Sequence, residues 1–128
     1  MTSYQIRLEN CSITKNERYT KSLFFDLIDK FNLRLRSVTD ESPYAGGITI
    51  MAILAEGSMV LHSYPYKEVA IIDYIDDGEF KALFPFDDFC HAIKELFRPE
   101  EIKYVMTDRF SFDIIECGIW GKDLTNTP

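Results

Sequence analysis

Two segments of the chain carry apolar residues at helical spacing, and most of the remaining sequence alternates as β-strands do. The first helix is expected over roughly residues 16–31, and the second begins near Pro85 and ends before Pro99. One strand, a helix, several strands, a helix and further strands follow in that order. This order favours an α+β fold with a mostly antiparallel sheet and two helices on one face. The defining apolar residues are Leu23, Phe24, Leu27, Ile28, Phe31, Phe86, Phe89, Cys90, Ile93 and Phe97.

The strands are predicted from alternation and from the turn residues between them. The apolar run Ile48–Ala55 indicates a well-buried strand, and the turn Glu56-Gly57-Ser58 connects it to Met59–Tyr64 as a hairpin. Thr39–Gly47 is expected to be a loop, and so is the segment from Asn10 to Thr14. The remaining strands are expected at Tyr4–Leu8, Leu33–Val38, Val69–Ile75, Ile102–Met106 and the alternating Phe110, Phe112 and Ile114.

Several of these strands have apolar residues on both faces, although helices on one side can cover only one face. This excess predicts a homodimer in which two sheets pack face to face. The whole chain is expected to form one domain over residues 1–118, with a tail over residues 119–128.

Charge and composition exclude some classes of partner. The formal net charge is −7, and no run of Lys or Arg is present, so nucleic-acid binding is not expected. The longest apolar stretch is too short to span a membrane. The three cysteines, Cys11, Cys90 and Cys117, form no Cys-x-x-Cys pair, which predicts free thiols in a reducing cytoplasm and no zinc site.

Few residues offer chemistry by themselves. His91 lies in the second helix, where a solvated or structural role is the usual one for histidine. His62 lies late in the hairpin, and its position alone leaves a structural and a functional role open. The acidic pairs Asp76-Asp77 and Asp87-Asp88 fall at a turn and a helix start, where acids are common, so no metal site is predicted.

The segment Gly46–Pro65 joins the buried-strand pattern to two short motifs, Ala55-Glu56 and His62-Ser63-Tyr64-Pro65. It resembles the core of the prokaryotic S-adenosylmethionine decarboxylases of polyamine biosynthesis. That family carries Ala/Ser-Glu-Ser-His, then three residues, then His-Thr-Trp-Pro-Glu. The resemblance covers residues 4–116 and implies a two-layer α/β sandwich whose protomers pair sheet to sheet.

The resemblance also implies a chemistry and shows where this chain departs from it. Family members cleave themselves at a Glu–Ser bond, and the serine becomes a pyruvoyl group that binds the substrate amine. Here Glu56 is present, but the serine position is Gly57, which has no hydroxyl. The processing histidine matches His62, its hydroxyl partner matches Thr49, and the proton-donor cysteine falls on Asp77. Tyr44 lies in the loop that borders the substrate pocket in the family, and the resemblance makes it a candidate to stack on the ligand. Glu56 is the second candidate for ligand binding.

Three hypotheses follow. In the first, the protein does not process itself, is catalytically degenerate, carries no cofactor, and binds S-adenosylmethionine or a polyamine or regulates a partner. In the second, the alignment slips by one residue, Ser58 forms the pyruvoyl group with help from His62 and Thr49, and Asp77 serves as an acid. In the third, the fold serves a different activity or a purely structural role, as a structural or interaction dimer.

Overall fold

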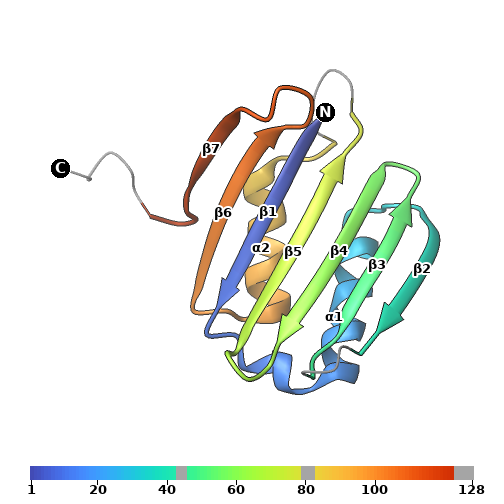
Figure 1. Cartoon of the computed structure of the whole chain (residues 1–128), viewed down its shortest axis with the longest axis vertical. Helices are drawn as coiled ribbons and strands as arrows, with labels where there is room; N and C mark the ends of the chain where they lie inside the picture. Colours follow the sequence, from blue (N-terminus) through green and yellow to red (C-terminus); the bar gives the residue numbers. More distant parts are fainter. Residues whose placement is uncertain (43–45, 79–82, 123–128) are drawn as a thin grey trace.

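The computed structural model describes residues 1–42, 46–78 and 83–122 and shows one seven-stranded sheet with two helices on one of its faces (Figure 1). The strand order is β2-β3-β4-β5-β1-β6-β7, so β5 is central, and every neighbouring pair is antiparallel. The expected α+β architecture, with a mostly antiparallel sheet and two helices on one face, is confirmed. The strands are β1 (Thr2–Glu9), β2 (Leu35–Glu41), β3 (Thr49–Leu54), β4 (Gly57–Tyr64), β5 (Val69–Asp76), β6 (Glu101–Asp108) and β7 (Ile114–Ile119).

Both helices form where their apolar stripes predict them. Helix α1 (Glu17–Lys30) begins after Asn16, whose side chain accepts a hydrogen bond from the Tyr19 N–H at 2.9 Å. Helix α2 (Phe86–Phe97) begins after Pro85 and ends at Arg98, which has a left-handed backbone. The short 3₁₀ helix η1 (Ser12–Lys15) lies before α1, in a segment whose first residues were expected to be loop.

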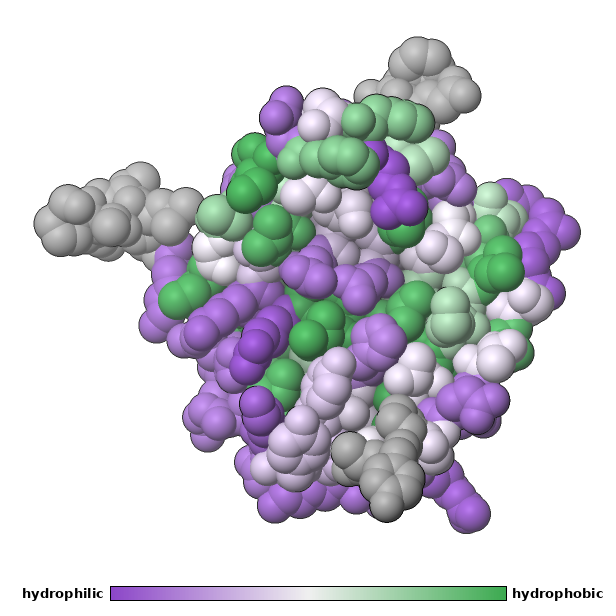
Figure 2. Space-filling view, viewed as in Figure 1, coloured by the Kyte–Doolittle hydropathy of each residue, from purple (hydrophilic) through white to green (hydrophobic). Residues whose placement is uncertain are grey.

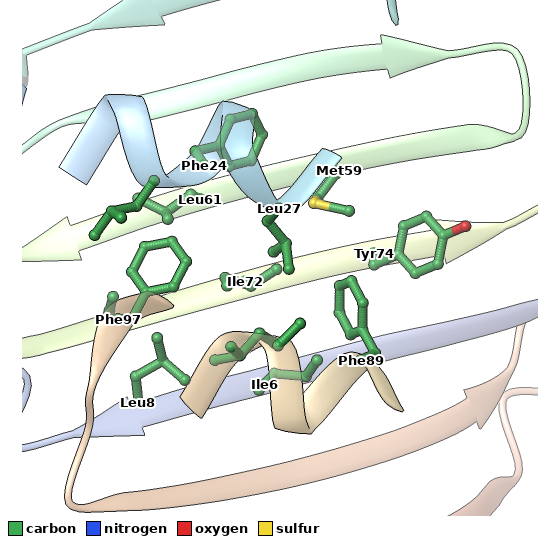
Figure 3. Close-up of a cluster of buried hydrophobic side chains, with 14 of the residues drawn as sticks. Ile6, Leu8, Phe24, Leu27, Met59, Leu61, Ile72, Tyr74, Phe89 and Phe97 are labelled. Atoms are coloured by element: carbon green, nitrogen blue, oxygen red, sulfur yellow. The ribbon is translucent and has the colours of Figure 1, made fainter. Parts of the chain in front are cut away.

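The core fills the space between the helices and the sheet (Figure 3). Alternate residues of each inner strand point at the helices, and most of them are fully buried. Burying each such large apolar side chain contributes about 1.5–3 kcal/mol. The largest fully buried side chains are Ile6, Leu8, Phe24, Leu27, Ile50, Met59, Leu61, Ile72, Tyr74, Phe89, Ile93 and Phe97.

Three local predictions were wrong around the first hairpin. Strand β2 continues to Glu41, into the expected loop, because it pairs with β3 along that length. The turn between β3 and β4 consists of Ala55 and Glu56, since Leu54 pairs directly with Gly57. Gly57 and Ser58 therefore belong to β4. Strand β3 is not buried on both faces: Met51 and Ile53 are 54% and 58% exposed.

The end of the chain also differs from the prediction. Phe110 and Phe112 lie in the connection between β6 and β7, because Asp108 accepts hydrogen bonds from the N–H groups of Phe110 and Ser111 at 2.9 and 3.0 Å and forms a turn. Strand β7 continues to Ile119, one residue past the expected boundary. The Trp120 indole N–H then donates to Asp87 on α2 at 2.8 Å. The division into domain and tail remains a prediction.

The face of the sheet opposite the helices, called here the open face, has no covering layer among the described residues (Figures 1 and 2). Apolar and polar residues are mixed across it in Figure 2. Met51, Ile53, Val60, Ile71, Ile75 and Val105 lie on this face, alternating with residues buried under the helices. Among the described residues, no helix is both long enough and apolar enough to cross a membrane.

Candidate functional site

Gly57 lies at the start of β4, where β3, β4 and β5 meet at one end of the sheet. It pairs with Leu54 on β3 and with Asp76 on β5. Its φ is +150°, and a Cβ atom added there would lie 1.9 Å from the carbonyl oxygen of Ile75. A separation that short is a severe clash with backbone atoms. The local structure therefore accepts glycine at this position and would have to shift for any other residue.

Glu56 is held by a residue from the connection between α1 and β2. Its two carboxylate oxygens accept hydrogen bonds from the backbone N–H of Arg34 at 2.8 Å and from the Arg34 Nε at 3.0 Å. The Glu56 side chain is only 14% exposed. The Arg34 backbone N–H, reinforced by the guanidinium, lowers the pKa of Glu56. Glu56 thus fastens the β3–β4 turn, and both of its carboxylate oxygens are already in use.

The two aspartates after β5 differ in their surroundings. Asp76 is buried, and its carboxylate accepts hydrogen bonds from the N–H of Gly78 at 2.7 Å and of Leu83 at 3.3 Å. It therefore fixes the chain on both sides of residues 79–82. Asp77 is exposed and donates its backbone N–H to the carbonyl of Glu56 at 3.0 Å. The backbones of Glu56, Gly57 and Asp77 thus come together at one end of the sheet.

Sequence reasoning did not identify the buried Tyr74 hydroxyl at this end of β5. Tyr74 is fully buried, and its hydroxyl has no hydrogen-bond partner within the described ranges. Burial raises its pKa, as does the charge of Asp76, so the phenol stays protonated. Its ring stacks on Tyr4 and Phe84. The alternation of β5 placed Tyr74 in the core but gave no sign of an unsatisfied hydroxyl.

Thr49 and His62 form a second pair, at the other end of the hairpin. They are directly opposite each other on β3 and β4, and Thr49 Oγ1 lies 3.1 Å from His62 Nδ1. Both side chains are half-buried on the open face. The hydrogen bond fixes the orientation of the imidazole ring. The pairing expected from the resemblance is therefore present in the structure.

One protomer does not bring all the expected residues together. Ser58 and His62 share the open face of β4, but they are four residues apart, which is roughly 13 Å along a strand. Gly57 is one residue farther from His62. Asp77 lies near Gly57 and far from Thr49. Tyr44 lies outside the described residues.

The cysteines supply no proton donor at this place. Cys11 and Cys90 are buried, and burial raises their pKa values to about 11 and about 12. Cys117 is exposed on β7, at the edge of the sheet opposite β2. Within residues 1–42, 46–78 and 83–122, no three His, Cys, Asp or Glu side chains are grouped to hold a metal ion.

The family model described as S-adenosylmethionine decarboxylase matches residues 4–110. The chain belongs to this family. The match covers the hairpin with Gly57 and His62 as well as both helices. A search of curated proteins found no match.

Two solved structures of adenosylmethionine decarboxylases share the fold. The adenosylmethionine decarboxylase from Aquifex aeolicus VF5 matches with a TM-score of 0.67 and 19% identity, over 84% of this chain and 88% of that one. The Trypanosoma brucei AdoMetDC-delta26 monomer matches with a TM-score of 0.57 and 10% identity, over 82% of this chain and 45% of that one. The expected two-layer fold of the family is confirmed, while the roles of individual residues stay predictions.

Proposed function

We propose that this family member does not process itself and acts by binding a ligand or a partner. The observation that supports this most is Gly57. The position that holds the nucleophile in the resembling enzymes has no hydroxyl here, and its backbone leaves no space for a side chain. Without a serine at this position, neither the ester nor the pyruvoyl group can form there.

Ser58 is the alternative nucleophile, and its surroundings support it less. It lies within β4 between Ile53 and Ile75 of the neighbouring strands. The His62 imidazole, the expected helper, is roughly 13 Å away along the same strand. A general base must lie within hydrogen-bond reach of the proton it removes, directly or through one water. A single protomer does not offer this arrangement.

The proposed ligand is S-adenosylmethionine or a polyamine, and the proposed site of action is the cytoplasm. Both ligands are cationic, which suits a chain of net charge −7. We further propose a homodimer through the open face, where Met51 and Ile53 are exposed in one protomer. A structural dimer without a ligand is the remaining alternative.

The intact mass of freshly purified protein under denaturing conditions tests the absence of processing. We expect one species at 14.9 kDa. Two fragments whose masses add up to about this value, with a blocked new N-terminus at residue 58, would overturn the proposal. Ser58→Ala is the matched control, because cleavage at Ser58 would disappear in this variant. Calorimetric titration with S-adenosylmethionine and with spermidine then separates a ligand-binding protein from a purely structural one.

A further inference from the structure

The two edge strands of the sheet, β2 and β7, differ in how well they are protected against pairing with another chain (Figure 1). Strand β2 contains three charged residues, Arg36, Asp40 and Glu41, and charges on an edge strand discourage pairing. Strand β7 contains one, Glu116, and has no lysine and no proline. A register shift in its pairing with β6 affects only the first part of the strand. The edge of β7 is therefore the less protected of the two.

The backbone of β7 has hydrogen-bonding groups on its outer side. The Trp120 N–H donates to the Ile102 carbonyl at 2.8 Å, and the same register pairs Cys117 with Val105. Hydrogen-bonded and non-hydrogen-bonded positions alternate along an antiparallel pair, so the N–H and C=O groups of Cys117 and Ile119 point away from β6. These groups lie in the plane of the sheet. A second copy that covers the open face therefore leaves them free.

Exposed apolar side chains gather at the same edge. Ile114 and Ile115 at the start of β7 are 64% and 57% exposed. Phe110 and Phe112, in the connection that precedes the strand, are 76% and 81% exposed. Neighbouring exposed apolar side chains of this size are typical of a surface that contacts another protein.

We propose that β7 pairs in antiparallel fashion with β7 of a second copy, so that two sheets join edge to edge. A two-fold axis between the strands places one residue opposite its own copy. With Glu116 on the axis, two carboxylates would face each other, which destabilises the pair. With Cys117 on the axis, Glu116 lies opposite Gly118 of the second copy, and Ile115 lies opposite Ile119. Both arrangements pair the strands over nearly their whole length, so charge selects Cys117.

The contact is weak and adds to the homodimer proposed through the open face. Two short edge strands bury less than the 1,000 Å² or so that a stable interface needs. Their pairing therefore forms at high protein concentration, where it brings dimers together. It uses the backbone edge of the sheet and neither of its faces.

Cys117 provides the first test. Residues opposite each other at a hydrogen-bonded position have Cα atoms about 5.5 Å apart, which suits a disulfide. Diamide oxidises two thiols to a disulfide and takes up their two electrons and two protons. We expect concentrated protein treated with diamide to give a band at twice the chain mass of 14.9 kDa on a non-reducing denaturing gel. Cys117→Ser should lose this band, because Cys11 and Cys90 are buried.

Two variants of Gly118 test the register. A Cβ there would lie 3.7 Å from the Tyr104 hydroxyl oxygen, an ordinary contact, so the position accepts a side chain. Gly118→Glu places a carboxylate opposite Glu116 of the second copy and should reduce the disulfide yield several-fold. Gly118→Lys places the opposite charge there and should maintain or raise the yield. Residue 118 pairs with Tyr104, which packs in the core under the helices, so a contact through the open face would not respond to this charge.

A relocated thiol is the matched control. Ser111→Cys, combined with Cys117→Ser, places an exposed thiol in the β6–β7 connection, away from the proposed axis, and should give several-fold less disulfide. The proposal fails if no disulfide-linked dimer forms, or if the relocated thiol reacts as readily as Cys117. It also fails if folded Gly118→Glu and Gly118→Lys give equal yields, since another contact would then bring the thiols together. None of these results depends on whether the chain processes itself or binds a ligand.

Discussion

At residue 57 the backbone and the missing side chain have to be considered together. A serine placed there would restore the hydroxyl that the family's chemistry needs. It would also have to adopt the positive φ of Gly57, which residues with a Cβ rarely do. We expect Gly57→Ser to lower the free energy of unfolding by about 1–3 kcal/mol, because φ is +150° and the Cβ would meet the Ile75 carbonyl at 1.9 Å. Urea unfolding followed by circular dichroism measures this change.

The neighbouring Ser58 supplies the control. Ser58→Ala changes a half-buried residue of the same strand whose backbone is ordinary, and it should alter stability by less than about 1 kcal/mol. If Gly57→Ser were as stable as the unchanged protein, the backbone at residue 57 would adapt readily. Glycine would then be a tolerated choice and not a requirement of this structure.

The elements are tied together at the same end of the sheet by Glu56 and Arg34. Because the folded-state pKa of Glu56 is lowered, its contribution to stability is present above the unfolded pKa of roughly 4.3 and is lost as the pH falls through the folded value. We expect Glu56→Gln to destabilise the protein by about 1 kcal/mol at pH 7. The difference from the unchanged protein should shrink below about pH 4, in unfolding curves measured across this range.

A matched control removes the same charge elsewhere. Asp26→Asn changes an exposed carboxylate on α1 that makes no ion pair with the described residues, and it should alter stability at pH 7 by less than about 0.5 kcal/mol. A Glu56→Gln difference that stayed constant from pH 7 to about pH 3 would show that the charge of Glu56 does not contribute through Arg34.

The sequence predicted the helices best, because each has a long stripe of apolar residues and a clear start. Helix α1 begins after Asn16, and α2 begins after Pro85. Strand ends were predicted less well. Phe110 and Phe112 alternate like a strand, but the Asp108 side chain binds two backbone N–H groups and turns the chain before β7 begins. The apolar run of β3 suggested two buried faces, whereas only one face packs against the helices. Apolar residues alone do not reveal whether a second face is covered.

The candidate site was predictable where it depends on the hairpin and not elsewhere. The pairing of Thr49 with His62 follows from the register of β3 and β4. The hydrogen-bond partner of Glu56 is Arg34, which is 22 positions away in the sequence, and no local pattern links the two residues. The buried carboxylate of Asp76 binds N–H groups on either side of a connection, which an acidic turn signal does not show.

For the whole molecule, the proposed homodimer depends on the open face. Its apolar residues are scattered among Ser, Thr, Gln and charged side chains, and two of the exposed ones, Met51 and Ile53, lie on β3. A stable interface between proteins needs about 1,000 Å² or more of buried surface, which one face of a seven-stranded sheet can provide. A second copy of the chain offers the same mixture of residues to the first.

We expect the protein to sediment as a dimer in analytical ultracentrifugation and Ile53→Lys to sediment as a monomer at the same concentration. The side chain of Ile53 is mostly exposed in one protomer, so lysine there should leave the fold intact while placing an unpaired charge in the proposed interface. Tyr19→Lys is the control, because Tyr19 is an equally prominent exposed apolar residue on α1, on the helix side of the sheet. It should remain a dimer. A protein that is monomeric at every concentration, or a Tyr19→Lys variant that dissociates while Ile53→Lys does not, would place the interface away from the open face.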